Sequence, residues 1–246
     1  MLRRSAVRLA VLACALFSGA VQAQTTHTVQ QVVFTFVPAD ITIELGDTIN
    51  FVWTSQTHTV TEGPGPVPTG GEAFNELLNT PNPLATVVFD GKFVIENSRP
   101  GHFYNYYCVP HFAQAQLGTV TVLSPWSNDG NALAGTNGEP LLYGNGPLTA
   151  GSSADLVLEN ALPNSLVALF ISFTSTPTPF KGGVLCTIPI AVQATFPIGP
   201  SGGVTLTDTI PPGLPAGTEV FWQYGIQDAG GPFGIALSNC LRSTFP

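Results

Sequence analysis

The stretch that decides the fold is PGHFYNYYCVPHFAQAQLGTV, residues 100–120. Aromatic residues dominate its first half and lead directly to Cys108, and a short loop then carries His111 and Gln116 before a β-branched run begins at Gly118. Aromatic and β-branched runs that are bounded by turn residues are typical of half-buried strands. This stretch therefore predicts two neighbouring strands with a chemically unusual loop between them.

The same signals recur along the chain and predict an all-β protein. A short helix is expected only at Glu72–Asn79, before two prolines. Ser, Pro, Asn and Gly predominate in residues 124–146, which we expect to be a linker or a loose entry into a second domain. This divides the chain into an N-terminal sandwich, residues 24–123, and a C-terminal antiparallel sandwich, residues 147–246. The expected strands are 28–37, 41–45, 49–54, 86–93, 101–107, 118–123, 155–159, 166–173, 184–192, 203–210, 219–227 and 235–241.

Residues 1–23 have the pattern of a secretory signal. A basic start is followed by an apolar stretch, Leu9–Phe17, and by a small-residue cleavage site that ends at Ala23. A lipoprotein box at Val11–Cys14 and a twin-arginine signal at Arg3–Arg4 are weaker alternatives. The apolar stretch is too short to span a bilayer, and no later segment is a candidate. We therefore expect a periplasmic or secreted protein without a membrane span.

The charge balance is acidic. The 246 residues include 7 Lys+Arg and 15 Asp+Glu, which gives a formal net charge of −8. Cleavage of the signal removes three arginines and no acid, leaving 4 basic residues and a net charge of −11. Nucleic-acid binding needs a basic face, so it is not expected. An acidic surface instead suggests a protein partner with a basic docking face and a salt-sensitive association.

Cysteine and histidine are scarce, and their placement is informative. After loss of the signal three cysteines remain, and one of them, Cys108, lies three residues before His111. His58 follows another expected strand upstream. One thiolate and two imidazoles with a weak axial ligand make a trigonal set that holds copper for electron transfer, because the soft thiolate stabilises Cu(I) and imidazole suits both oxidation states. A lone Cys or His is more often structural, so the combination carries the hypothesis.

These residues resemble the cupredoxin family, the plastocyanin-like blue copper proteins, from about residue 25 to residue 123. The resemblance implies a Greek-key β-sandwich with one mononuclear type 1 copper site. Its metal ligands carry over to His58, Cys108 and His111, but Gln116 stands where Met is usual, and the single Met of the chain is residue 1. Gln116 is therefore the expected axial ligand, as in stellacyanin-like members, with Gln114 as the alternative. The motifs that carry the resemblance are Phe36-x-Pro38, Ile41-x-Ile43-x-x-Gly46-Asp47, Gly101-x-Phe103-x-Tyr-Tyr-Cys108-x-Pro110-His111 and Gly118-x-Val120-x-Val122.

The resemblance implies a one-electron Cu(I)/Cu(II) shuttle that exchanges electrons with redox protein partners. Enzymatic copper chemistry is not expected, because only His27 and His102 remain for a second copper site. No serine nucleophile motif or phosphate-binding glycine loop stands out either. The alternative is a secreted binding or docking protein in which copper is structural or stored and the C-terminal domain carries the function.

Once Cys108 is assigned to copper, Cys186 and Cys240 form an even pair. In an oxidising compartment we expect them to form a disulfide, although two separate buried thiols are the alternative. The C-terminal half also resembles a β domain of secreted proteins from planctomycete-like bacteria, through turn motifs such as Pro179-Phe180-x-Gly182-Gly183. That resemblance implies an immunoglobulin-like sandwich and no particular chemistry.

Overall fold

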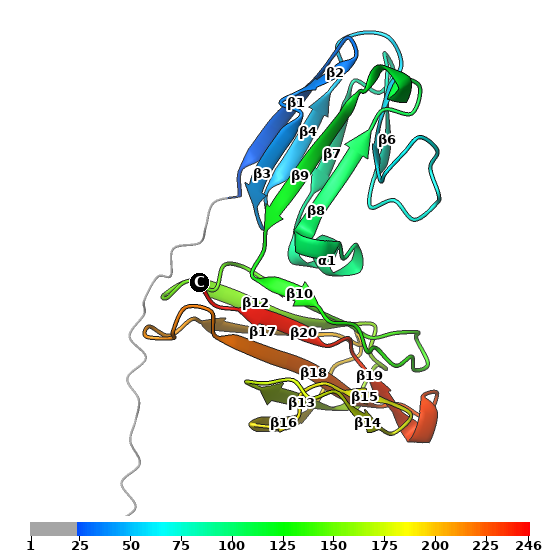
Figure 1. The fold of residues 1–246 in the computed structure, drawn as a ribbon. Helices are drawn as coiled ribbons and strands as arrows, with labels where there is room; N and C mark the ends of the chain where they lie inside the picture. The colour runs from blue at the N-terminus through cyan, green and yellow to red at the C-terminus, as the bar shows by residue number, and fades with distance from the viewer. Residues whose placement is uncertain (1–23) are drawn as a thin grey trace, which may run out of the picture.

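The structure is a computed structural model that describes residues 24–246, so the expected signal segment lies outside the described residues. The protein is almost entirely β, in two layered regions that Figure 1 shows one above the other. Among the described residues, no helix is long and apolar enough to cross a membrane. The N-terminal elements are β1 (Thr26–Val32), β2 (Thr35–Val37), β3 (Asp40–Glu44), β4 (Thr48–Val52), β5 (His58–Glu62), β6 (Asn75–Leu78), β7 (Leu84–Val88), α1 (Gly91–Glu96), η1 (Pro100–His102), β8 (Phe103–Tyr107), η2 (Phe112–Gln114) and β9 (Leu117–Leu123).

The N-terminal region is a sandwich of two sheets. One sheet has the strand order β2-β1-β4-β7 and the other β3-β9-β8-β5-β6. The β1–β4 and β3–β9 pairs are parallel and join strands that are not consecutive, which excludes a simple meander. Alternate residues of the strands point inward, so the two sheets enclose an aromatic core that includes Phe51, Tyr104 and Tyr106. The predicted all-β class, with a two-sheet sandwich in the N-terminal region, is thus confirmed.

The C-terminal region also consists of packed sheets. A larger sheet has the order β10-β20-β18-β13-β16, with β19 paired to β18, and a three-stranded sheet has the order β11-β12-β17. Their inner faces share one core, which includes Leu142, Leu158 and Tyr224. The elements are β10 (Trp126–Asn128), β11 (Leu141–Asn145), β12 (Ser153–Glu159), β13 (Leu166–Ser172), β14 (Thr178–Phe180), β15 (Gly183–Leu185), β16 (Val192–Pro197), β17 (Val204–Thr209), β18 (Glu219–Gln227), η3 (Pro232–Gly234), β19 (Ile235–Leu237) and β20 (Leu241–Thr244).

The prediction of a helix at Glu72–Asn79 is wrong. The chain forms β6 there and pairs antiparallel with β5, with Leu78 buried opposite His58. The helix α1 instead follows β7, where a strand had been expected to continue. The Asp90 side chain accepts a hydrogen bond from the Phe93 backbone N–H at 2.7 Å and so caps the first turn.

The stretch expected as a linker, residues 124–146, contains two strands of the C-terminal sheets. β10 pairs with β20 and β11 pairs with β12. Trp126 and Leu142 are buried, and the backbone of Leu142 exchanges hydrogen bonds with the side chain of Asn239. Gly144 packs under the Trp126 ring, where a Cβ would lie 2.2 Å from a ring carbon. Gly144, in the stretch expected as a linker or domain entry, therefore serves close packing in a sheet.

The two regions meet through α1. Ile95 of this helix is buried in the C-terminal core, and Leu45 packs against both cores. The Gly91 N–H donates to Asn145 Oδ1 at 2.8 Å, and Lys92 pairs with Glu159 at 2.7 Å. Figure 1 shows α1 facing β10, whereas the turn between β8 and β9 lies at the opposite end of the N-terminal region. We call these two places the junction end and the free end.

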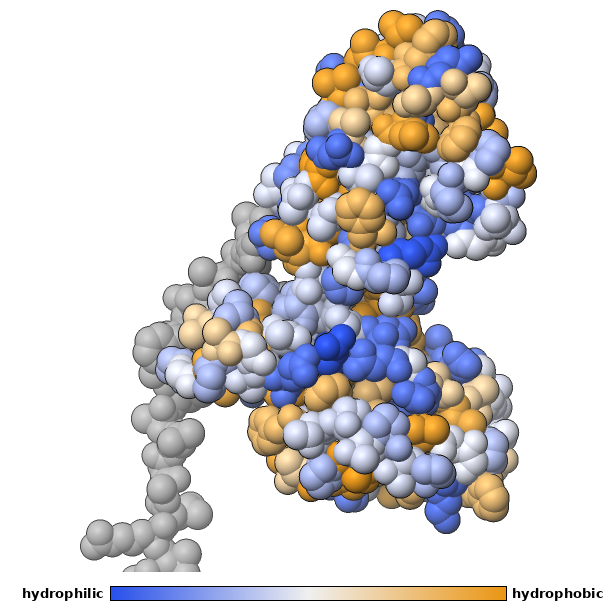
Figure 2. All heavy atoms as spheres, in the orientation of Figure 1, coloured by the Kyte–Doolittle hydropathy of each residue, from blue (hydrophilic) through white to orange (hydrophobic). Residues whose placement is uncertain are grey.

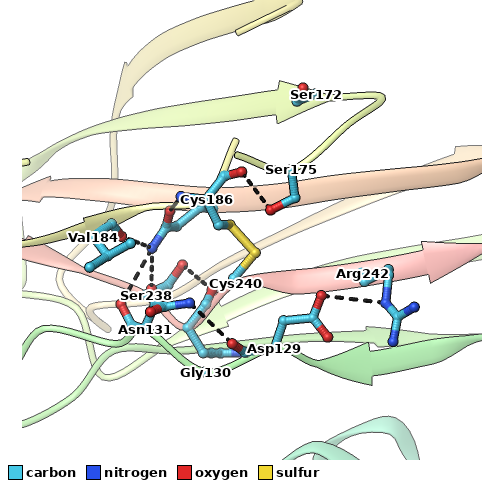
Figure 3. The surroundings of a disulfide bond; sticks show 12 residues. Asp129, Gly130, Asn131, Ser172, Ser175, Val184, Cys186, Ser238, Cys240 and Arg242 are labelled. Atoms are coloured by element: carbon cyan, nitrogen blue, oxygen red, sulfur yellow. Dashed lines mark hydrogen bonds and ion pairs between the residues drawn. A yellow bond between two sulfur atoms is a disulfide. The ribbon is translucent and has the colours of Figure 1, made fainter. Parts of the chain in front are cut away.

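Cys186 and Cys240 form a disulfide inside the C-terminal region. Figure 3 shows the bridge among hydrogen bonds that fix both of its ends. Ser175 Oγ donates to the Cys186 carbonyl at 2.9 Å, and the Cys240 N–H donates to the Gly130 carbonyl at 2.6 Å. The bridge joins the segment after β15 to the segment before β20. It therefore ties the middle of the domain to its last strand.

Candidate metal centre

Cys108 lies at the free end, immediately after β8. Its backbone N–H donates to the Gln116 carbonyl at 3.0 Å, so the loop leaves and re-enters the sheet at one point. The strand partners Tyr107 and Leu117 continue the β8–β9 ladder just below. Cys108 is fully buried and is the free cysteine of the described residues. Its thiol is therefore held at the closed base of the loop.

The loop from Cys108 to Gln116 is folded tightly by its own backbone. The His111 N–H donates to the Cys108 carbonyl at 3.2 Å, and the Gln116 N–H returns to the His111 carbonyl at 3.3 Å. The η2 turn ends at Ala115 in the left-handed conformation, φ 58°, which reverses the chain toward β9. These bonds give both His111 and Gln116 fixed positions relative to the cysteine.

His58 comes from a different part of the chain, the first residue of β5. Its Nδ1 lies 3.5 Å from Cys108 Sγ and 3.0 Å from His111 Nδ1, and the Cys108 Sγ to His111 Nδ1 distance is 3.4 Å. Three donors at metal bond lengths of roughly 2.0–2.3 Å in a trigonal plane lie about 3.5 Å apart. The three atoms therefore have the spacing that ligands of a single ion require.

Gln116 places a side-chain amide beside these three atoms. It is fully buried, and its Oε1 lies 2.9 Å from His58 Nδ1. Its Nε2 faces the Thr35 carbonyl at 3.4 Å, which turns the amide oxygen toward the histidine. Gln114, the alternative axial residue, is an exposed residue of η2. The structure thus places Gln116, and not Gln114, beside the three other donors.

Burial sets the protonation of this group. Loss of solvent lowers the pKa of His58, helped by the nearby His111, so its imidazole is neutral and available as a ligand. Burial also raises the pKa of the Cys108 thiol, although the Thr59 N–H, which points at Sγ from 3.4 Å, works in the opposite direction. Without metal, both shifts favour the neutral forms of His58 and Cys108, so a metal that binds here displaces the thiol proton.

The donor chemistry fits a type 1 copper site. His58, Cys108 and His111 are the described residues whose ligand atoms lie within 4.8 Å of one another, and two of the three are buried. Two imidazoles, one thiolate and a weak oxygen donor are the set that copper takes in electron-transfer proteins. A structural zinc site would instead use four strong ligands. The residues present therefore fit one mononuclear copper ion.

The two remaining histidines lie outside this group. His27 pairs with Asp47 at 2.8 Å, and His102 lies in η1 at the start of β8. Sequence reasoning missed two neighbours of the site, Thr59 and Phe34. Thr59 directs its backbone N–H at the thiol, and the Phe34 ring packs at a tilt against His111 with 4.8 Å between ring centroids. A backbone donor leaves no signal in side-chain identity, and Phe34 was hidden in what looked like one continuous strand.

Comparison with known proteins agrees with this geometry. Residues 23–123 match the family described as "Copper binding proteins, plastocyanin/azurin family". The N-terminal region is thus similar to the cupredoxin family of copper-binding proteins. A curated relative, pseudoazurin of Paracoccus pantotrophus, is 32% identical over 87 residues, which cover 35% of this chain and 52% of the relative. The chain thus spans about half the length of the curated relative that it matches.

Solved structures are also similar to part of the chain, and two of them serve as examples. Pseudoazurin of Methylobacterium extorquens AM1 matches with 24% identity and a TM-score of 0.27, covering 39% of this chain and 74% of that one. Plastocyanin of Dryopteris crassirhizoma matches with 25% identity and a TM-score of 0.30, covering 39% of this chain and 98% of that one.

Proposed function

We propose that the protein is a one-electron carrier, with copper bound by His58, Cys108, His111 and Gln116. The observation that carries the proposal is the convergence of these four side chains, from the start of β5 and from the loop between β8 and β9, at the free end of the N-terminal region. Copper supplies the Cu(I)/Cu(II) couple when bound. The chain's own part is to hold the donors in one arrangement, so that little rearrangement accompanies the gain or loss of an electron.

His111 is the proposed point of electron exit. Unlike His58, Cys108 and Gln116 it is only partly buried. The turn between β1 and β2, which touches it through Phe34, exposes Val33, and the end of β2 exposes Val37. Figure 2 shows apolar residues gathered at this free end. A flat apolar contact around His111 would let a partner approach closely, and the acidic surface elsewhere favours a partner with a basic docking face.

The C-terminal domain is proposed to be a structural or docking module without a catalytic role. It packs on the junction end, away from the ligand loops, so it leaves the free end open for a partner (Figure 1). Its disulfide supports an oxidising compartment, and with the expected signal segment this supports a periplasmic or secreted location. The resemblance to secreted planctomycete-type β domains supports the same location.

Addition of Cu(II) to the purified protein tests the proposal. We expect one copper per chain, a strong thiolate-to-copper visible band and reversible one-electron reduction. Cys108→Ser removes the soft ligand and should abolish the band. The exposed Gln114→Ala, in the same loop, is the matched control and should retain it. A pale spectrum, or a copper that cannot be cycled, would instead support storage or a structural metal, with the function in the C-terminal domain.

A further inference from the structure

A chain of side-chain hydrogen bonds runs from the ligand loop across β5 to β6. The Val109 N–H, in the residue after Cys108, donates to Thr59 Oγ1 at 2.8 Å. Thr61 Oγ1 lies 3.0 Å from Thr59 Oγ1 and 2.9 Å from Asn75 Oδ1. These hydrogen bonds therefore link the Val109 peptide, next to Cys108, with β6 at the edge of the sheet.

The donors and acceptors in this chain have one consistent direction. An amide oxygen can only accept, so the single hydroxyl proton of Thr61 goes to Asn75 Oδ1. The Thr61 oxygen then accepts from the Thr59 hydroxyl, whose oxygen in turn accepts from Val109 N–H. Each hydroxyl both donates and accepts, an arrangement in which neighbouring bonds polarise and strengthen one another. The rotation of the Thr59 side chain is thereby fixed.

Packing does not explain the hydroxyl of Thr61. This residue is fully buried, whereas Asn75, its Cα partner on β6, is exposed. Valine has nearly the same shape, and a buried hydroxyl costs free energy unless it is hydrogen-bonded. The hydroxyl therefore serves the chain of hydrogen bonds. Thr59, whose hydroxyl is part of this series of hydrogen bonds, also directs its backbone N–H at Cys108 Sγ from 3.4 Å.

We propose that Thr61 and Asn75 are positioning residues of the metal centre, which hold Thr59 so that its N–H stays aimed at the Cys108 sulfur. This inference rests on the proposed function, because it concerns the same copper site. A hydrogen bond to the thiolate withdraws charge from sulfur and favours Cu(I), and such bonds are among the features that tune the potential of these centres. Neither residue touches a proposed copper ligand.

The test compares Thr61→Val with Thr61→Ser in the full copper-loaded protein. At a fixed solution potential, the Cu(I)/Cu(II) ratio of Thr61→Val should fall up to about fivefold, the equivalent of one net hydrogen bond of about 1 kcal/mol. Its visible band should also shift in energy. Thr61→Ser keeps the hydroxyl and should behave like the wild type. The matched control is Thr187→Val, a fully buried threonine of the C-terminal region whose hydroxyl has no hydrogen-bond partner among the described residues.

An unchanged ratio and band in Thr61→Val overturns the inference, while the wild-type band and its reversible reduction still support the carrier function. A wild type without that band overturns both. If Thr61→Val does not fold, Asn75→Ala at the exposed end replaces it. A lowered Cu(I)/Cu(II) ratio in Asn75→Ala then supports the inference, and an unchanged ratio overturns it.

Discussion

The two ends of the N-terminal region arrange their polar side chains in different ways. At the junction end, two pairs join a basic side chain to an acidic one: His27 with Asp47, and Lys92 with Glu159. At the free end, His58, Cys108 and His111 face one another, and none of them has a carboxylate partner among the described residues. Paired groups satisfy each other and serve stability, whereas donors that converge on one point serve a ligand.

This contrast separates two kinds of substitution. Changes among the paired groups should lower the free energy of unfolding and leave the copper spectrum intact. Changes among the converging groups should alter the spectrum or the potential with little effect on unfolding. A substitution that did both would show that the two ends are coupled.

The C-terminal disulfide belongs with the paired groups and gives the largest expected effect on stability. Replacing Cys186 and Cys240 together by Ala releases a cross-link with a sequence separation of 54. In the chain-entropy treatment this costs about 4 kcal/mol of unfolding free energy. Denaturant unfolding monitored by circular dichroism measures it, and the visible copper band should be unchanged. Loss of the band in this variant would break the contrast.

Gly91→Ala tests the junction itself. A Cβ there would lie 2.0 Å from the Gly144 carbonyl oxygen, so α1 must move away from β11. Overpacking of this kind costs about 1–3 kcal/mol, although alanine favours a helix over glycine. Thermal unfolding measures this loss of stability. Gly199→Ala, where a Cβ would meet no atom within 4 Å, is the control. A Gly91→Ala protein as stable as this control would show that the junction is loose.

Asp47 gives the pH dependence of the junction end. Burial alone would raise its pKa, but the hydrogen bond from His27 and those from the Thr25 and Glu44 N–H groups lower it below the ordinary 3.8. A carboxyl group with a lowered folded-state pKa contributes stability that is present above pH 3.8 and is lost as pH falls through the lower folded value.

Unfolding free energies measured between pH 6 and pH 2 should therefore fall more steeply in the wild type than in Asp47→Asn. The variant should be less stable at pH 6 by about 1–2 kcal/mol, since it loses charge-assisted hydrogen bonds. Asp208→Asn, at an exposed position, is the control. If the unfolding free energies of Asp47→Asn and the wild type depend on pH in parallel, Asp47 does not stabilise the fold through its charge.

The sequence predicted the β class and the residues of the free end because both depend on local pattern. Alternating strands and the Cys108-x-Pro-His111 spacing can be read without knowing the tertiary fold. The junction was missed, since its signals depend on distant partners. Gly144 reads as a turn residue until Trp126 is known to cover it, and residues 124–146 read as a linker for that reason. Likewise β6 forms as a strand only because β5 offers it an edge.

Gln116→Met changes a residue of the converging group at the free end and should have the smallest effect on stability. A thioether is softer than an amide oxygen and favours Cu(I), so the reduction potential should rise. We expect the Cu(I)/Cu(II) ratio at fixed solution potential to increase about tenfold, which is 59 mV for one electron. Spectroelectrochemical titration measures it. Unfolding of the metal-free protein should barely change, because the two side chains have similar volumes.

Gln114→Met is the matched control, because it places the same thioether in the same loop on an exposed residue of η2. If the reduction potential rises in Gln116→Met alone, the axial ligand is Gln116, whose Oε1 lies 2.9 Å from His58 Nδ1. A rise with Gln114→Met alone would require the loop to rearrange around the ion, since Gln116 and not Gln114 is buried beside the donors. An unchanged reduction potential in both variants would mean that Gln116 does not bind copper. Its amide would then only form hydrogen bonds with His58 and Thr35, and it would belong with the paired groups.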